Sequence, residues 1–269
     1  MSHRALLKHT LTAALVAVGA AATASSVQAQ NGTPTGIEVA QRAEQVEGGF
    51  GDQSASLTMT LRNRNGDEST RRMRNLTLEV DGDGDKTLVI FDEPNDVKGT
   101  AFLNHTHKEG SDDQWLYLPA LRRVKRIASD NKSGPFMGSE FAYEDISSQE
   151  VEKYSYAFVS AEDVEGTPMY VIERTPVDPK SGYTKQVVWY DQSENLLQRV
   201  DFYDRKSELL KTLTYHDYSH HEGEYWRAAR MEMVNHQTGK STTLAFSEYA
   251  FKTGLTDRDF AESALRRAR

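Results

Sequence analysis

A succession of short β-strand patterns separated by hairpin-type turns runs through most of this chain and limits the folds open to it. Asn65-Gly66 and Asp81-Gly82 are turn dipeptides that favour tight connections between antiparallel strands. Between such turns, bulky residues recur at alternate positions, which is the side-chain period of a strand. The patterns predict strands at residues 54–62, 71–80, 86–92, 100–105, 114–118, 122–128, 154–160, 169–175, 185–190, 196–203, 209–218, 225–234 and 242–250. The chain is therefore predicted to be mostly antiparallel sheet.

Many of these strands carry apolar or aromatic residues on both faces, as Trp189 and Tyr190 do at successive positions. A sheet with two apolar faces needs cover on both. Helical patterns that could supply it lie at residues 36–46, 138–149 and 257–267. Because a flat open sheet of this width is unusual, we expect a mainly β (α+β) fold. Its form would be an incomplete antiparallel β-barrel, or half-barrel, with the helices covering the concave side.

The N-terminus has the pattern of a secretory signal peptide. Arg4 and Lys8 precede an apolar, alanine-rich run at residues 11–22, and small residues follow at the positions that signal peptidase reads. The run is shorter than the roughly 20 residues that a membrane-spanning helix needs. We expect residues 1–29 to be removed and residues 30–269 to form a single domain. With no cysteine to acylate, the mature protein is expected in the periplasm, where it would contact membranes only transiently.

Composition and partial motifs argue against several function classes. The absence of cysteine excludes disulfides, zinc-thiolate sites and cysteine nucleophiles, and 40 acidic against 32 basic residues argue against nucleic-acid binding. Residues 239–242 resemble the end of a phosphate-binding loop, but Val234 stands where the motif requires glycine. Asp81, Asp83 and Asp85 have calcium-loop spacing, but Lys86 replaces the required glycine and Asp92 stands where a bidentate glutamate is expected. We therefore expect no enzymatic activity, no metal and no cofactor.

A basic strand pattern follows the strand that carries Trp115 and Tyr117. Its cationic residues are Arg122, Arg123, Lys125 and Arg126. On one interpretation they form a positive patch for a phosphate head group or an acidic partner surface. On the other, the two strands are a plain hairpin with Trp115 and Tyr117 in the core and the basic side chains in solvent. Strand alternation sends the four basic side chains to both faces, which weakens the single-patch interpretation.

The segment at residues 134–143 combines loop-forming and apolar residues. Gly134, Pro135 and Gly138 indicate a loop, yet loops are usually polar and this one carries Phe136, Met137, Phe141 and Tyr143. The aromatic side chains must be buried somewhere. They could plug the end of a barrel, or they could form a movable lid over a ligand cavity.

The last two segments resemble the family of outer membrane lipoprotein-sorting proteins, which are LolA-like. The resemblance extends over most of residues 36–267. It is carried by DQWLYLP at 113–119, RVKRI at 123–127, GSEFAYED at 138–145, FDEP at 91–94, VKGTAFL at 97–103 and LTDRDF at 255–260. The family implies an incomplete antiparallel β-barrel with helices packed in its opening. It implies transport of a lipid or an acylated lipoprotein between membranes, with no catalytic residues.

The leading hypothesis is therefore a periplasmic carrier that holds a lipid or the acyl chains of a lipoprotein in an apolar cavity. The resemblance further implies an RND-type transporter in the inner membrane as a partner, since the chain has no nucleotide motif. The alternative is a non-carrier module that senses the envelope or docks on a membrane transporter. The residues expected to line the cavity are Phe102, Trp115, Tyr117, Phe136, Met137, Phe141, Tyr143 and Trp189.

Overall fold

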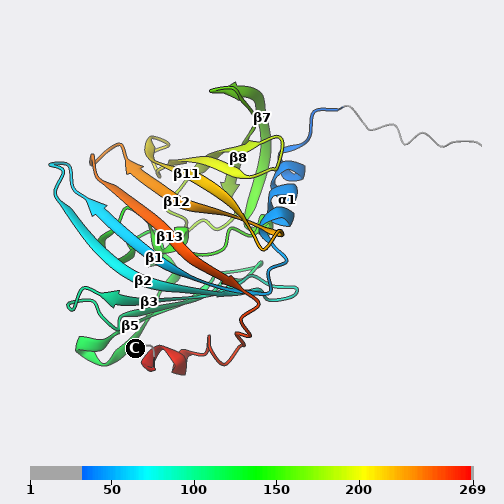
Figure 1. Ribbon diagram of the computed structural model, residues 1–269. Coiled ribbons are helices and arrows are strands. Elements are labelled where there is room, and N and C mark those ends of the chain that lie inside the picture. Colours follow the sequence, from blue (N-terminus) through cyan, green and yellow to red (C-terminus); the bar gives the residue numbers. More distant parts are fainter. Residues whose placement is uncertain (1–31, 268–269) are drawn as a thin grey trace, which may run out of the picture. The chain divides into compact units, whose positions relative to one another are not determined.

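The structure is a computed structural model that describes residues 32–267, so the predicted signal peptide lies outside the described residues (Figure 1). Thirteen strands form one sheet in which every pairing is antiparallel. The predicted mainly β class is confirmed. The strands are β1 (Asp52–Arg62), β2 (Glu68–Leu78), β3 (Lys86–Glu93), β4 (Ala101–His105), β5 (Asp113–Leu118), β6 (Arg123–Ile127), β7 (Tyr154–Val164), β8 (Thr167–Pro176), β9 (Lys185–Asp191), β10 (Leu197–Tyr203), β11 (Leu209–His221), β12 (Tyr225–Asn235) and β13 (Ser241–Phe251).

The sheet consists of two meanders that are joined through the first and last strands. The order across it is β6-β5-β4-β3-β2-β1-β13-β12-β11-β10-β9-β8-β7. The pairing of β1 with β13 runs from Gln53 opposite Phe251 to Arg62 opposite Ser241. Within the described residues, β6 and β7 each have a strand neighbour on one side only, so the sheet is open. The chain crosses from one edge strand to the other through residues 128–153.

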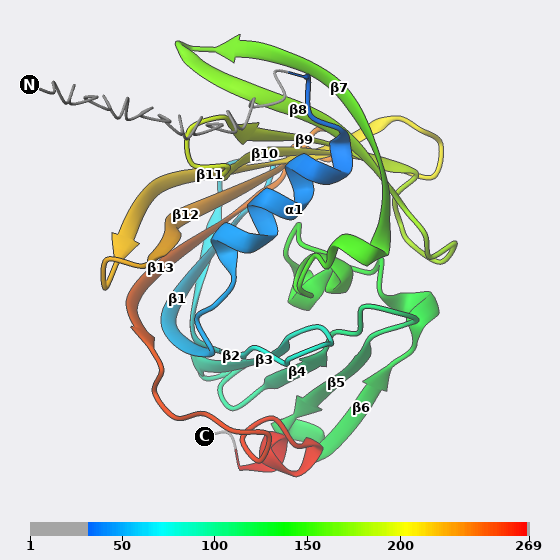
Figure 2. The same ribbon diagram turned by 90° about the vertical axis from the view of Figure 1, so that its right-hand side faces the viewer.

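One α-helix, α1 (Gly36–Glu47), is present in the described part of the chain, and it confirms the prediction for residues 36–46. Thr35 and Glu38 form a capping box, in which the Thr35 backbone N–H donates to the Glu38 carboxylate at 2.7 Å. The apolar face of α1 buries Val39, Ala40 and Ala43. It contacts β7, β8 and β12, so α1 lies across the inner face of the sheet (Figure 2).

The other two predicted helices are wrong, and with them the expectation that several helices cover the concave side. Residues 138–149 lie in a segment of short 3₁₀ turns. The chain reverses at its start, where the Phe136 backbone N–H donates to the Phe141 carbonyl at 2.7 Å and Pro135 forms an isolated β-bridge with Ala142, so these backbone groups are not paired in a helix. Near the C-terminus, the Asp259 carboxylate accepts a hydrogen bond from the Thr256 backbone N–H at 2.9 Å. This local turn competes with a helix, and only a 3₁₀ helix, η6 (Glu262–Arg266), follows.

The C-terminal segment covers the outer face of the sheet. Phe260 and Leu265 are fully buried against Leu88, Ile90 and Leu103, which belong to β3 and β4. Their neighbours in the strands, among them Phe102, face inward and belong to a second, larger cluster. Alternate residues of the same strands therefore enter two separate cores, one on each face.

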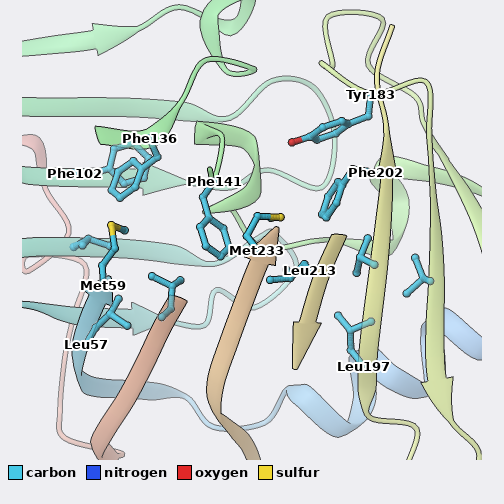
Figure 3. Packing of buried hydrophobic residues seen from close by; sticks show 14 of the residues in the cluster. Leu57, Met59, Phe102, Phe136, Phe141, Tyr183, Leu197, Phe202, Leu213 and Met233 are labelled. Carbon is cyan, nitrogen blue, oxygen red and sulfur yellow. The ribbon is translucent and has the colours of Figure 1, made fainter. Parts of the chain in front are cut away.

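The segment that links β6 to β7 fills part of the inner face with aromatic side chains. Phe136 and Phe141 are 1% and 2% exposed. The rings of Phe136 and Phe102 lie side by side (Figure 3), with 5.2 Å between their centroids. The centroid of the Tyr143 ring is 5.5 Å from that of Phe136. Its contacts are those of a core plug, which is one of the two interpretations that the sequence left open.

A buried ion pair ties this segment to the sheet. Lys211 on β11 donates from Nζ to Asp145 Oδ2 at 2.6 Å and to the Glu140 carbonyl at 2.8 Å. The two charged side chains are each 4% exposed. Asp145 Oδ1 also accepts a hydrogen bond from the Tyr183 hydroxyl at 2.8 Å. Nearly all polar atoms of the pair are thus satisfied, as a buried ion pair requires.

This arrangement predicts a large penalty for removing the lysine. In Lys211→Met, Asp145 would remain buried without its cation, and we expect the free energy of unfolding to fall by about 3–5 kcal/mol. Urea denaturation followed by circular dichroism measures the change. Lys185→Met is the matched control, because its ion pair with Glu173 is about one-third exposed and is worth about 1 kcal/mol or less. If both variants lost the same free energy of unfolding, the Lys211–Asp145 pair would not behave as a buried ion pair.

Candidate ligand cavity

A cavity of about 800 Å³ lies on the inner face of the sheet, beside the aromatic plug. Its wall is built from α1, from β1 to β3 in one meander and from β7 to β13 in the other. Most of the lining is apolar: Ala40, Ala43, Phe50, Leu57, Met59, Met73, Val89, Phe136, Phe141, Ile146, Val151, Tyr156, Tyr190, Leu196, Leu197, Leu213, Tyr215, Tyr218, Trp226, Ala228, Met231, Leu244, Phe246 and Tyr249. Cavities of roughly 300–1,000 Å³ with such linings are typical of small-molecule sites.

Carboxylates make up most of the charged lining. They come from the end of α1, from the turn between β2 and β3 and from the segment before β7: Glu44, Glu47, Glu79, Asp81, Asp83, Asp85, Asp145 and Glu150. Burial raises the pKa of Asp85 to about 7, and the nearby carboxylates of Glu150 and Glu79 raise it further. Burial also raises the pKa of Glu150. Part of this acidic lining is therefore protonated near neutral pH.

Two of these glutamates, together with the neighbouring Glu152, could be considered as metal ligands. Carboxylate oxygens of Glu44, Glu150 and Glu152 lie within 4.8 Å of one another. However, the Lys108 ammonium lies 3.4 Å from the Glu152 carboxylate and neutralises part of the negative charge of the three glutamates. Acidic groups of this kind are common on protein surfaces without an ion, and we assign no metal to them.

Of the eight residues predicted to line a cavity, the structure brings two to its wall, Phe136 and Phe141. Phe102 is fully buried in the inner core, and Met137 and Tyr143 pack against that core. These five residues therefore lie together on the inner face, although Phe102, Met137 and Tyr143 pack in the core rather than at the cavity surface.

The structure places the remaining three on the outer face of the sheet. Trp115 and Tyr117 pack with the C-terminal segment, since they alternate with the inward-facing Leu116. The Trp189 indole N–H donates to the Glu162 carboxylate at 2.8 Å, and the Arg199 guanidinium lies 4.6 Å from the Trp189 ring centroid. None of the three contributes to the inner cavity.

The basic residues of β6, together with Arg122 in the turn just before it, lie at an open edge of the sheet. Arg122, Arg123, Lys125 and Arg126 are all exposed. Lys125 pairs across the strands with inward-facing Leu116, whereas Arg126 pairs with outward-facing Trp115 and forms an ion pair with Asp113. The four side chains are thus divided between the two faces, as alternation predicts.

Polar groups that the strand patterns did not single out also lie inside the cavity, among them the hydroxyls of two tyrosines whose rings belong to the apolar wall. Arg174, Tyr190 and Tyr215 line its wall from β8, β9 and β11. A signal was present, because Arg174 shares its strand face with Ile172, an apolar residue two positions earlier. A charged residue at an inward position of a strand is informative, because arginine is rarely fully buried unless it is paired.

The raised pKa of Asp85 predicts that stability depends on pH. The folded protein holds a proton that the unfolded chain loses above its ordinary value of 3.8, so the free energy of unfolding should fall as the pH rises from about 4 to about 7. In the Asp85→Asn variant, the free energy of unfolding should decrease less over this pH range than it does in the wild type. Urea denaturation at pH 5 and pH 8 measures it, with Asp81→Asn, at an exposed position of the same turn, as the control. An unchanged pH dependence in Asp85→Asn would refute the prediction.

Within residues 32–267, no helix is both long enough and apolar enough to cross a membrane.

Comparisons with known proteins give a consistent relationship. A family model described as an uncharacterized protein matches residues 83–267, and a search of the curated proteins finds no match. A crystal structure from Vibrio parahaemolyticus, assigned as an outer membrane lipoprotein-sorting protein domain, is 56% identical. The match covers 86% of this chain and 98% of that one, with a TM-score of 0.84.

Two further crystal structures support the same fold. A DUF1329 family protein from Desulfovibrio piger is 33% identical over 85% of this chain and 97% of that one, with a TM-score of 0.80. A LolA superfamily protein from Nitrosomonas europaea is 20% identical over 86% of this chain and 100% of that one, with a TM-score of 0.71. The match at 56% identity shows that the chain belongs to the family of outer membrane lipoprotein-sorting protein domains, and the Nitrosomonas europaea match shows that its fold is LolA-like.

Proposed function

We propose that this protein is a periplasmic carrier that binds a lipid, or the acyl chains of a lipoprotein, in the inner cavity and moves them across the envelope. The observation that carries the proposal is the apolar cavity of about 800 Å³ between α1, the sheet and the plug. The family relationship supports it, because the Vibrio parahaemolyticus relative is assigned to lipoprotein sorting. The signal-peptide pattern of residues 1–29 supports export to the periplasm.

The size of the cavity suits one acyl chain. If a methylene group takes up about the 30 Å³ that a water molecule does in the liquid, a 16-carbon chain needs on the order of 500 Å³. Exposure of such a chain to water costs about 0.8 kcal/mol per methylene, or on the order of 10 kcal/mol in total. A soluble carrier must remove this cost, and the apolar wall is suited to do so.

The direct test is the content of the purified protein. The full chain is expressed with its N-terminal segment, isolated from the periplasm, extracted with organic solvent and analysed by mass spectrometry. We expect about one bound lipid or acylated molecule per protein chain. A protein that neither retains a lipid nor takes one up from vesicles would overturn the carrier proposal and favour the docking alternative.

A cavity-filling variant sharpens this test. Met231 on β12 is partly buried and lines the cavity, so Met231→Trp should occupy space that the acyl chain needs. We expect the variant to fold and to lose most of its lipid uptake, as measured by displacement of a fluorescent fatty acid. Val159→Trp, at a 55% exposed position of β7, is the control and should bind normally. Full uptake by folded Met231→Trp would place the ligand elsewhere.

We also propose that an RND-type inner-membrane transporter receives or supplies the cargo. The exposed basic residues of β6 offer a surface for an acidic partner. In a variant with Arg122→Glu and Lys125→Glu, we expect less transporter to be cross-linked to the carrier in native membranes while lipid uptake is retained. Equal cross-linking by both proteins would remove β6 from the partner interface.

A further inference from the structure

The wall of the cavity contains a buried guanidinium. Arg174 on β8 is 5% exposed and lines the cavity. Its Nε donates a hydrogen bond to Gln186 Oε1 at 2.6 Å on β9, and the guanidinium carbon lies 4.6 Å from the centroid of the Tyr154 ring. Among residues 32–267, no carboxylate lies within ion-pair distance of Arg174. Its cationic charge is therefore buried without a counterion.

An unpaired buried cation is costly, because removing a charge from water costs several kcal/mol that only a counterion or strong hydrogen bonds offset. Lys211 is buried to a similar degree, and it has the Asp145 carboxylate at 2.6 Å. The contrast shows that this fold can supply a counterion where a buried cation serves the structure. Arg174 differs in facing the cavity.

Two tyrosine hydroxyls lie in the electrostatic neighbourhood of Arg174. Tyr190 and Tyr215 both line the cavity and both interact electrostatically with the guanidinium. Neither hydroxyl makes a hydrogen bond to another described residue, whereas the nearby Tyr218 hydroxyl donates to the Leu197 carbonyl at 2.6 Å. Burial raises the pKa of Tyr190 to about 12 and raises that of Tyr215 as well, so both remain protonated donors.

These free donors open onto the cavity rather than into packed core. In the described part of the chain, the Tyr225 hydroxyl is the one fully buried side-chain polar atom that has no partner. The terminal nitrogens of Arg174 and the two tyrosine hydroxyls must therefore reach the cavity space. The cavity thus presents a guanidinium and two phenol donors, and no described residue, the lining carboxylates included, accepts a hydrogen bond from the terminal nitrogens of Arg174 or from the two hydroxyls.

Glu47 is the acidic group to consider as an internal counterion. It lines the cavity at the end of α1, and its charge interacts with those of Arg227 and Arg174. However, Glu47 lies at an exposed position, and it forms no ion pair with either arginine within 4.0 Å. In the described part of the chain, Arg174 therefore has no carboxylate in direct contact.

We infer that Arg174, Tyr190 and Tyr215 bind the anionic group of the cargo, a carboxylate or phosphate, while its acyl chain lies along the apolar wall. The inference rests on the proposed carrier function and narrows the cargo to an acidic amphiphile. A guanidinium matches both anions, because its N–H groups can donate two parallel hydrogen bonds to two oxygens. The hydroxyls supply further donors to the same group.

The first experiment compares ligands on the wild-type protein. Palmitate, its neutral methyl ester, lysophosphatidic acid with the same chain and inorganic phosphate compete with a fluorescent probe. We expect palmitate or lysophosphatidic acid to bind roughly 10- to 100-fold more tightly than the ester, the range expected for charge-assisted hydrogen bonds. Whichever of these two ligands binds more tightly shows whether the anionic group of the cargo is a carboxylate or a phosphate. If inorganic phosphate displaced the probe as well as lysophosphatidic acid does at equal concentration, the bound anion would not need to be a lipid headgroup, and the inference would be overturned.

The second experiment tests the residues. The Arg174→Met variant should lose the preference for the acid over the ester and keep its affinity for the ester. Tyr190→Phe or Tyr215→Phe should lose part of the preference for the acid. Arg199→Met is the matched control, because it removes a cation from the outer face, where Arg199 pairs with Asp201. Thermal unfolding verifies that each variant is folded.

The outcomes separate the inference from the carrier proposal. If acid and ester bind equally well to the wild type, the headgroup site is wrong and the carrier remains. If neither binds, the carrier proposal itself fails. If Arg174→Met does not fold, the wild-type comparison of acid with ester still decides. A folded Arg174→Met protein that keeps its preference for the acid would overturn the role of this residue.

Discussion

The pairing of β1 with β13 is the interaction on which the rest of the structure depends. It joins two meanders that are each local in sequence into one sheet, through a ladder that runs from Gln53 opposite Phe251 to Arg62 opposite Ser241. Without it, the inner residues of β1 to β3 and those of β8 to β12 would not share a face. The cavity needs both groups, because its wall takes Leu57 from the first meander and Leu213 from the second.

Local signals predicted the strands well and the helices poorly. Each hairpin is encoded by its own turn and by alternation on either side, so thirteen strand patterns correspond to thirteen strands. The segment before β7 contains enough helix-compatible residues to suggest a helix. Its conformation is instead decided by contacts distant in sequence, such as those of Asp145 with Lys211 and Tyr183. Tertiary contacts of this kind override weak helical propensity and cannot be read from a short window.

The candidate site was predictable in kind but only partly in its residues. Alternation divides a strand into two faces, yet it does not say which face becomes concave. In β5 the larger aromatic residues, Trp115 and Tyr117, cover the outer face, and the C-terminal segment buries them. The inward positions hold Gln114 and Leu116, which pack under the plug. The size of the aromatic residues therefore predicts the wrong face of the sheet as the cavity wall. Arg174, a charged residue on the same strand face as apolar residues, indicates the correct face.

A carrier of this design must release what it binds. Transfer of an acyl chain from a bilayer to an apolar cavity exchanges one hydrocarbon environment for another, so the large hydrophobic terms nearly cancel. Selection and release then depend on the smaller differences that polar contacts make. The plug is held by a buried ion pair and is costly to move, which leaves the cavity wall largely preformed. The polar groups inside it, Arg174 with Tyr190 and Tyr215, are consequently the part of the wall that can distinguish one cargo from another.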